Sequence, residues 1–327
     1  MSLLRVAIVQ DLVSSDLRSG LERTAALARR ATQEGARLVV FSETWLPGYP
    51  AWLDLCRDAG LWNNPAVKAE FVRYAENSVS VEGESGRELA RIAAECGVAL
   101  VVGVSERVER GPGRGTLYNA LLAYQPDGTL ALHHRKLMPT YTERLVWGQG
   151  DADGLRAFET PEARVGGLIC WEHWMPLARQ AMHDEGEDVH VALWPTVHEK
   201  HQLASRHYAF EGRCFVLAAG SLMRASQLPA GLDPHPDQVT SSDQWVMRGG
   251  SCVIGPDAEF VLPPVFDRPE ILVADLDLSR NRAESMTLDV SGHYARPDCF
   301  TFTPKRSRRS LGAAGRLDAA DRPPGRR

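Results

Sequence analysis

The sequence lacks several features that mark common classes of protein. Its six cysteines lie far apart without a CxxC pair, so closely spaced thiols do not indicate a zinc site or a disulfide framework. No apolar run approaches the roughly 20 residues needed to cross a bilayer. No basic-then-apolar leader precedes the strand-like run Leu3–Val9. We therefore expect reduced thiols, a cytoplasmic location and no membrane partner.

The charged residues give no sign of a nucleic-acid or metal partner. The formal net charge is −5, and the basic residues are scattered through the body of the chain instead of forming a stripe that follows phosphates. The histidines at His198 and His201 lack the spacing of a zinc-binding HExxH motif. The glycine-rich segment 111–115 lacks the Lys-Ser/Thr ending of a phosphate loop, and we interpret it as a hairpin loop.

The composition fits one folded domain followed by a tail. Of the 327 residues, 44% are hydrophobic and 24% are charged, which is near the average for soluble globular proteins. No linker interrupts the body of the chain, and we expect a single domain over residues 1–304. Residues 305–327 are rich in Arg, Gly, Ala and Pro and lack aromatics, which predicts a mobile tail.

Strand-like and helix-like segments alternate along most of the chain. Apolar, β-branched runs predict strands over residues 3–9, 37–41, 98–104, 118–123, 165–169, 189–194 and 215–219. Apolar residues at helical spacing predict helices over residues 17–34, 86–95, 176–183 and 202–214. Three more strands are expected after residue 249. This alternation is typical of helices that cover a sheet in an α/β protein.

The first chemically informative segment is 41–49, which carries Glu43. This carboxylate follows an apolar strand and precedes a Pro-Gly turn. In α/β proteins the carboxyl ends of strands face the crevice where ligands bind, so Glu43 is a candidate site residue. Considered alone, Glu43 is better interpreted as a helix-capping or solvated side chain.

The second segment, 134–144, contains Lys136 followed by Pro139, aromatic residues and a second carboxylate at Glu143. Considered alone, Lys136 fits an ordinary surface lysine. The residues after it are uncommon in a plain loop, which makes the segment a candidate part of a site.

The third segment, 165–174, runs from a glycine-containing strand directly into Cys170 and then toward a helix that Pro176 helps to start. A strand-to-helix turn presents a nucleophile to the crevice, and amide groups at the start of a helix can lower a thiol pKa and bind an oxyanion. Cys170 is therefore a candidate nucleophile. A buried structural cysteine is the alternative.

Together these segments resemble the nitrilase superfamily, whose Glu-Lys-Cys triad occurs in this order and in these contexts. The resemblance assigns the catalytic triad to Glu43, Lys136 and Cys170. It implies a four-layer α-β-β-α sandwich in which two mixed sheets are flanked by helices. The run from Cys170 to His173 resembles the true nitrilase branch, whose members hydrolyse organic nitriles.

The resemblance also implies a mechanism that uses nitrile, water and no cofactor. Glu43 would act as general base for Cys170, and Lys136 with the Trp171 amide would stabilise the negative charge that develops. Glu143 and His173 are expected in supporting roles, although a salt bridge and a packed histidine are the alternatives. The expected substrate pocket, for which packing in the core is the alternative, comprises Tyr49, Trp174 and Trp194.

Three other functions use the same triad: aliphatic amidase, carbamoylase, and cyanide hydratase or dihydratase. A non-catalytic, filament-forming assembly protein is an alternative of another class, which retention of all three triad residues argues against. By resemblance we expect a homo-oligomer, either a dimer or a larger assembly such as a spiral filament.

Overall fold

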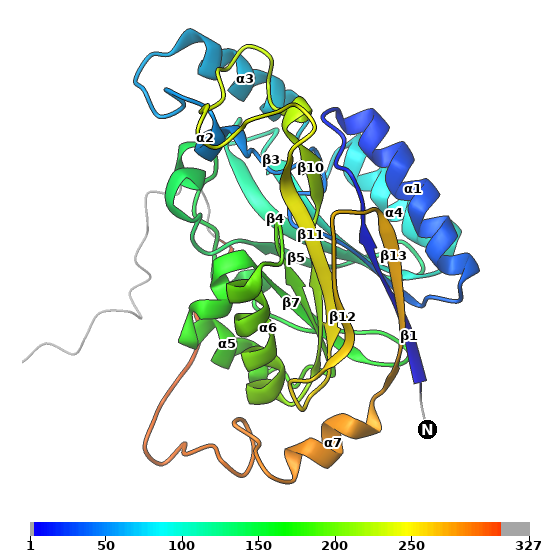
Figure 1. The fold of residues 1–327 in the computed structure, drawn as a ribbon. Helices are drawn as coiled ribbons and strands as arrows, with labels where there is room; N and C mark the ends of the chain where they lie inside the picture. Colours follow the sequence, from blue (N-terminus) through cyan, green and yellow to red (C-terminus); the bar gives the residue numbers. More distant parts are fainter. Residues whose placement is uncertain (1–2, 309–327) are drawn as a thin grey trace, which may run out of the picture.

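The computed structural model describes residues 3–308, which form two stacked β-sheets between layers of helices (Figure 1). The first sheet has six strands in the order β13-β1-β2-β3-β4-β5. Their bounds are Glu270–Asp277, Leu3–Gln10, Leu38–Phe41, Ala99–Arg107, Leu117–Tyr124 and Leu130–Arg135. Strands β1, β2 and β3 are parallel, whereas β13, β4 and β5 join by antiparallel pairing.

The second sheet has seven strands in the order β10-β11-β9-β8-β7-β6, with β12 paired to β11. Their bounds, in that order, are Leu222–Arg224, Trp245–Ile254, Phe215–Ala219, Val189–Leu193, Arg164–Ile169, Phe158–Glu159 and, for β12, Phe260–Phe266. Strands β7, β8 and β9 are parallel and the other pairs are antiparallel. Both sheets are therefore mixed.

Helices cover the outer face of each sheet and complete four layers. The helices are α1 (Leu17–Gln33), α2 (Trp52–Leu55), α3 (Pro65–Glu76), α4 (Glu84–Cys96), α5 (Pro176–His183), α6 (Glu199–Gly212) and α7 (Ser279–Ser285). Figure 1 shows α1 beside α4 on one side of the sandwich and α5 beside α6 on the other. The α-β-β-α sandwich implied by the family resemblance is confirmed.

Alternation along the strands explains why the central sheets are apolar on both faces. In β1, Ala7 and Val9 pack in the cluster that includes α1 and α4, whereas Val6 and Ile8 pack in the cluster that includes the second sheet. Successive side chains of a strand point to opposite faces, so a strand between two layers must be apolar at every position. This is why the sequence shows short continuous apolar runs.

The strand directions bring separate segments to one edge of the first sheet. Since β4 is antiparallel to β3 and β5 is antiparallel to β4, β5 runs in the same direction as β2. Glu43, after β2, and Lys136, after β5, therefore lie at the same edge. A Cβ at Gly103 would lie 2.2 Å from the Ser42 carbonyl oxygen, so only glycine lets β3 approach this segment so closely.

Two elements near this edge were not predicted from the sequence. Helix α3 (Pro65–Glu76) has only two buried side chains, Glu70 and Tyr74, and so gives a weak apolar pattern. Strand β5 (Leu130–Arg135) is alternately buried and more exposed and ends in charged residues. Strand β5 is recognised by its pairing with β4, because its own sequence lacks the pattern of a buried strand.

The described chain ends with residues that contact the body. Arg306 lies 2.6 Å from Glu185 Oε1, and the Arg308 guanidinium donates to the His133 carbonyl oxygen at 2.8 Å. The remainder of the predicted tail, 309–327, lies outside the described residues, and the boundary at residue 304 stays a prediction. Among residues 3–308, no helix has the length and apolar character needed to cross a bilayer.

Candidate active site

Glu43 lies just beyond β2 and is completely buried. Its Oε1 accepts hydrogen bonds from Asn119 Nδ2 at 2.6 Å and from Lys136 Nζ at 3.1 Å. Its Oε2 is buried and has no hydrogen-bond partner among the described residues. One carboxylate oxygen is thus held in place while the other is free to accept a proton.

Lys136 is also buried and forms ion pairs with two carboxylates. Its Nζ donates to Glu143 at 3.0 and 2.7 Å in addition to Glu43. Glu143 lies in a 3-10 helix, η1 (Tyr141–Leu145), and accepts further hydrogen bonds from Tyr49 Oη at 3.0 Å and the Thr140 amide at 2.8 Å. Because the lysine is enclosed by acceptors, its ammonium group is fixed in position.

Cys170 begins a 3-10 helix, η3 (Cys170–Trp174), immediately after β7. Its φ is 55°, in the left-handed region that non-glycine residues rarely adopt. Helix α5 starts after this turn, with Pro176 at its first position. The predicted strand-to-helix turn is therefore present, with a 3-10 turn between strand and helix.

Three of the eight non-glycine residues with positive φ in the described chain lie at or beside these residues. Besides Cys170, positive φ angles occur at Thr44 (44°), next to Glu43, and at Tyr141 (45°), at the start of η1. Such conformations persist only where the surrounding structure enforces them, and they cluster at functional sites. The segments that carry Glu43, Glu143 and Cys170 therefore each contain one enforced backbone conformation.

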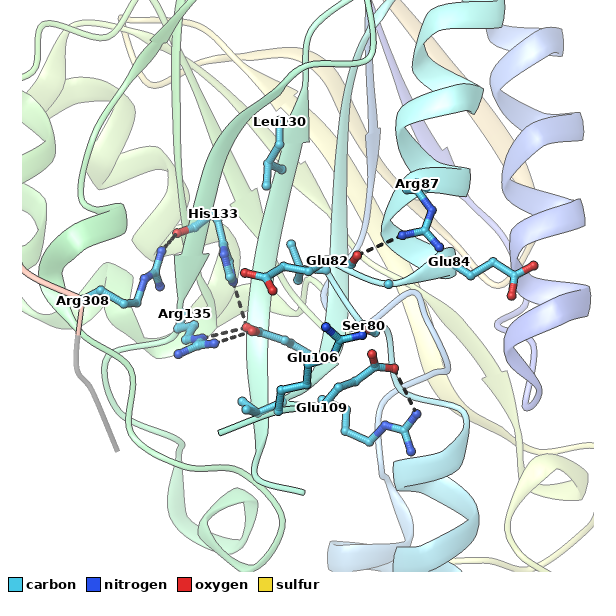
Figure 2. Close-up of a pocket in the computed structure, with 15 residues that line it drawn as sticks. Ser80, Glu82, Glu84, Arg87, Glu106, Glu109, Leu130, His133, Arg135 and Arg308 are labelled. Carbon is cyan, nitrogen blue, oxygen red and sulfur yellow. Dashed lines mark hydrogen bonds and ion pairs between the residues drawn. The ribbon is translucent and has the colours of Figure 1, made fainter. Parts of the chain in front are cut away.

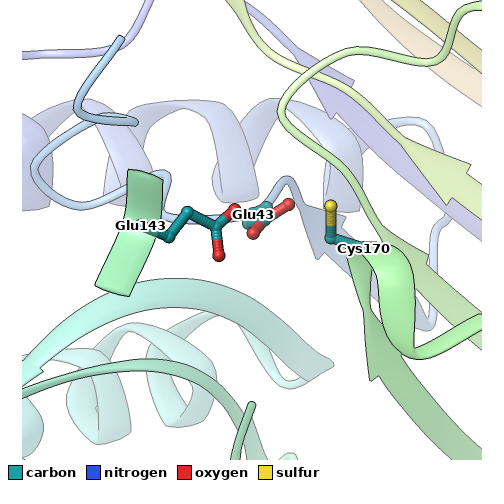
Figure 3. Close-up of side chains that lie close together, drawn as sticks. All are labelled: Glu43, Glu143 and Cys170. Carbon is teal, nitrogen blue, oxygen red and sulfur yellow. The ribbon is translucent and has the colours of Figure 1, made fainter. Parts of the chain in front are cut away.

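The carboxylates and the thiol form one compact group (Figure 3). Oxygen atoms of Glu43 and Glu143 and the sulfur of Cys170 all lie within 4.8 Å of one another, and Figure 3 shows Glu43 between the other two. Three such ligand atoms could in principle hold a metal ion. However, Lys136 Nζ bonds to both carboxylates, so an ammonium group already supplies the cation that they face.

Burial and the neighbouring charges shift the pKa values of Glu43, Cys170 and Lys136. Burial raises the pKa of Glu43 to about 7, although Lys136 opposes the shift. Burial and the negative charge of Glu43 raise the pKa of the Cys170 thiol well above its ordinary value, whereas Lys136 and the Trp171 N–H lower it. For Lys136, burial favours the neutral form, but Cys170, Glu43 and Glu143 outweigh it and raise the pKa. The thiol is therefore protonated at rest and lies beside a carboxyl that titrates near neutrality.

Glu172 joins the lysine segment to the cysteine turn, a role that was not predicted. Its two oxygens accept from the Leu137 amide at 2.7 Å and from the Ile169 amide at 2.8 Å, and both face His134 Nε2. Burial raises the pKa of Glu172, but His134 and the two amides outweigh it, so the pKa lies below its ordinary value. Leu137 follows Lys136 and Ile169 precedes Cys170, so the Glu172 carboxylate fixes the spacing between Lys136 and Cys170.

Asn119 was also missed, although its signal is visible in the sequence. It is a polar residue within the otherwise apolar strand β4, and its side chain is buried against Glu43. A buried amide needs a hydrogen-bond partner, so an asparagine in such a strand indicates a polar neighbour across the layer.

The expected supporting and pocket residues lie in two places. Tyr49 lies at the triad, bonded to Glu143. The rings of Trp171 and Trp174 are 4.7 Å apart, Trp174 contacts Trp194, and Trp194 stacks on His173. Trp171 is half exposed, whereas Trp194 and His173 are buried. The structure thus brings Tyr49 to Glu143 and gathers the three tryptophans around η3, and the pocket assignment stays a prediction.

A separate surface pocket of about 570 Å³ lies beside β3 and β5 (Figure 2). Several of its polar groups are bonded within the pocket wall: His133 and Arg135 both bond Glu106, at 2.8 and 2.7 Å, and Arg87 donates to the Glu82 backbone carbonyl oxygen. Neither Glu43, Lys136 nor Cys170 lines it. We therefore place the candidate active site at the buried group of Figure 3.

Comparison with known proteins agrees with this fold and identifies its class. Residues 5–283 match the family model for carbon-nitrogen hydrolases. The chain is 38% identical to an aliphatic nitrilase from Sinorhizobium fredii over 92% of this chain and 95% of that protein. It is 34% identical to a bifunctional nitrilase/nitrile hydratase from Lupinus angustifolius over 92% of this chain and 86% of that protein.

Solved structures show the same architecture. A carbon-nitrogen hydrolase from Helicobacter pylori superposes with a TM-score of 0.66 at 19% identity, covering 90% of this chain and 96% of that one. Fold and relatives together define an enzyme that hydrolyses carbon–nitrogen bonds other than peptide bonds. The chain belongs to the carbon-nitrogen hydrolase family, as the resemblance implied.

Proposed function

We propose that this protein is a nitrilase, which converts an organic nitrile and two waters into a carboxylic acid and ammonia. The observation that carries the proposal is the arrangement at Glu43, which has a carboxylate oxygen within 4.8 Å of the sulfur of Cys170. Its Oε1 is held by Asn119 and Lys136, and its buried Oε2 has no hydrogen-bond partner among the described residues. Similarity to proteins named nitrilases at 33–38% identity supports the nitrile as substrate.

Glu43 acts as the general base for Cys170. A thiolate is the nucleophilic form of cysteine, and burial keeps the Cys170 thiol protonated until a base removes its proton. A base works best when its pKa lies near the working pH, and burial raises the pKa of Glu43 to about 7. The carboxylate therefore takes the thiol proton as the sulfur attacks the nitrile carbon.

The bond changes then balance without any cofactor. Attack forms a carbon–sulfur bond, and the nitrile nitrogen takes the proton that Glu43 removed, which gives a thioimidate. A first water adds to carbon, the carbon–nitrogen bond breaks, and ammonia leaves a thioester. A second water hydrolyses the thioester and restores the Cys170 thiol. Lys136 and the Trp171 N–H face the negative charge that forms at nitrogen and then at oxygen.

Release of ammonia from a panel of nitriles tests the proposal. Aliphatic, aryl and arylacetic nitriles are compared with their amides, with wild-type protein and the Cys170→Ala variant side by side. We expect acid and ammonia from at least one nitrile, and no release by the variant. Turnover of amides alone would instead place the protein among the amidases or carbamoylases.

The same assay measures the ratio of acid to amide. The tetrahedral adduct can expel ammonia or the cysteine sulfur, and the second route releases an amide. One relative is named as both nitrilase and nitrile hydratase, so both products are quantified for every nitrile. Hydrogen cyanide belongs in the panel, because cyanide hydratases and dihydratases use the same chemistry.

We also propose that the protein forms a homo-oligomer in the cytoplasm. Exposed apolar side chains on η3, α5 and α6 support self-association: Trp171, Leu177, Leu203 and Phe210 are 51, 67, 67 and 45% exposed. A contiguous patch of exposed apolar groups marks an interaction surface, and η3 packs against both α5 and α6. Light scattering after size-exclusion chromatography tests this, since a monomer at all concentrations would contradict it.

A further inference from the structure

A second buried polar cluster lies behind Cys170, and the proposed reaction steps do not use it. It runs from the Cys170 carbonyl oxygen through His173 and His190 to Glu187. His173 Nδ1 lies 2.7 Å from the Cys170 oxygen, and the Nε2 atoms of the two histidines are 3.0 Å apart. His190 Nδ1 lies 2.9 Å from Glu187 Oε1, and Tyr208 donates to Glu187 Oε2 at 2.5 Å.

These contacts leave one consistent placement of the hydrogens for neutral rings. A carbonyl oxygen only accepts, so His173 Nδ1 donates to Cys170 and the His173 Nε2 accepts. His190 Nε2 must then donate to it, which leaves His190 Nδ1 as an acceptor. The remaining donor is Glu187, whose carboxyl must carry a proton on Oε1 while its Oε2 accepts from Tyr208.

The surroundings favour this neutral form. Burial raises the pKa of Glu187 to about 8, and burial lowers the pKa of His190 well below its ordinary value and that of His173 to about 3. The other titratable or charged groups that face this chain of side chains from neighbouring elements are Arg164, Glu172, Arg179, His183, Glu185 and Cys214.

The absence of a side chain at Gly166 leaves space for the Glu187 carboxyl. Gly166 in β7 pairs with His190 in β8, and a Cβ at Gly166 would lie 1.8 Å from Glu187 Oε1. Any other residue at position 166 would displace the carboxyl. The glycine at position 166 is thus needed because of Glu187, which lies 21 positions further along the sequence.

The hydrogen bond to Cys170 bears directly on the site. The Cys170 carbonyl and the Trp171 N–H belong to one planar peptide unit, so fixing the carbonyl fixes the direction of the N–H. That N–H faces the Cys170 sulfur and is the second donor of the proposed mechanism. His173 therefore determines where this donor points.

We propose that Glu187, His190 and His173 are positioning residues, which hold the Cys170–Trp171 peptide through a neutral chain of hydrogen bonds that depends on one proton shared by Glu187 and His190. This inference deepens the proposed function and rests on it. When the proton leaves, the hydrogen on His190 moves to Nδ1 to meet the Glu187 carboxylate. His190 Nε2 then faces His173 as an acceptor. The hydrogen of His173 therefore moves from Nδ1 to Nε2, and the hydrogen bond to the Cys170 carbonyl oxygen is lost.

The test combines three variants. Glu187→Gln mimics the protonated acid, because its amide donates to His190 and accepts from Tyr208 at every pH. His173→Asn keeps a donor toward the Cys170 oxygen but cuts the chain to His190. His173→Leu removes the donor, and its apolar side chain keeps the space filled.

The first measurement is the alkaline side of the kcat/KM profile for a nitrile substrate. We expect wild-type activity to fall as pH rises through about 8, and Glu187→Gln and His173→Asn to lose that fall. We expect His173→Leu to lose about tenfold to 100-fold at neutral pH, since a small misplacement of a reacting group can cost about 100-fold. An unchanged alkaline fall in Glu187→Gln, or equal activity of the Leu and Asn variants, would overturn the proposal.

The second measurement does not depend on catalysis. Ring ¹⁵N spectra of histidine-labelled protein report which nitrogen carries hydrogen, with His173→Asn giving the assignment. We expect His173 to carry hydrogen on Nδ1 at neutral pH and to change at alkaline pH in wild type but not in Glu187→Gln. Hydrogen on Nε2 of His173 at neutral pH would overturn the proposal, whereas the expected spectra without nitrile turnover would reject only the proposed function.

Discussion

Two buried polar clusters flank Cys170, and they differ in charge. In front of the sulfur, Glu43, Lys136 and Glu143 are held as ion pairs. Behind the turn, His173, His190 and Glu187 form a neutral chain. The proposed function accounts for this difference. Charged groups are needed where bonds change and new charge must be stabilised, whereas side chains that only position the backbone are buried at lower free-energy cost when they carry no net charge.

The largest effect is expected from removing the base of the front cluster. In Glu43→Gln the amide can still accept from Asn119 and Lys136, but it cannot take a proton from Cys170. Activity on nitriles should fall by about 10²- to 10⁴-fold, the usual contribution of general acid–base catalysis, while stability is unchanged or higher. Steady-state kinetics and urea unfolding measure the two quantities. Near-wild-type activity would show that Glu43 is not the base.

Removing the cation from the front cluster should affect folding as well as activity. Lys136→Met leaves Glu43 and Glu143 buried without their partner, and breaking a buried ion pair costs about 3–5 kcal/mol. The matched variant Lys136→Met with Glu143→Gln removes one charge of each sign. We expect it to recover part of the free energy of unfolding but not the activity, as urea titrations and nitrile assays will record.

The acid side of the pH profile follows from the Glu43 carboxyl. The base must be ionised to act, and its pKa is raised to about 7, so kcat/KM should fall about tenfold per pH unit below that value. This is the opposite side of the profile from the one assigned to Glu187. A flat profile on the acid side would separate Glu43 from proton transfer.

The smallest effect is expected at Glu172, which belongs to neither cluster but links the two segments of the front one. In Glu172→Gln one side-chain oxygen remains to accept, so one of the Leu137 and Ile169 amides loses its acceptor. We expect a loss of about 1–3 kcal/mol in unfolding free energy with a modest fall in kcat. Equal stability to wild type in urea titrations would argue that the link is not needed.

Sequence reasoning located the front cluster because its members stand at the ends of recognisable strands. Glu43 and Cys170 follow β2 and β7, where side chains must face the edge of a sheet. Lys136 was harder, since it follows a run of charged residues that is typical of a surface. Its burial depends on Glu43 and Glu143, which lie 93 and 7 residues away.

The rear cluster could not be predicted in the same way. Its acid, Glu187, lies between a helix and a strand, where a charged residue ordinarily faces water. Its contacts with His190, Tyr208 and the space above Gly166 depend on the packing of β7, β8 and α6. The Gly166-Gly167 pair was interpreted as part of the cysteine motif, and only the structure shows that the Glu187 carboxyl requires a glycine at position 166.

The central claim is that Cys170 forms a covalent bond to the nitrile carbon with Glu43 as its base. Acid-quenched intact-protein and peptide mass spectrometry during nitrile turnover tests it most directly. We predict an acyl or imidoyl adduct on the Cys170 peptide in wild type, and a much slower appearance of it in Glu43→Gln. Release of ammonia by Cys170→Ala at the wild-type rate, without any adduct in wild type, would contradict the account.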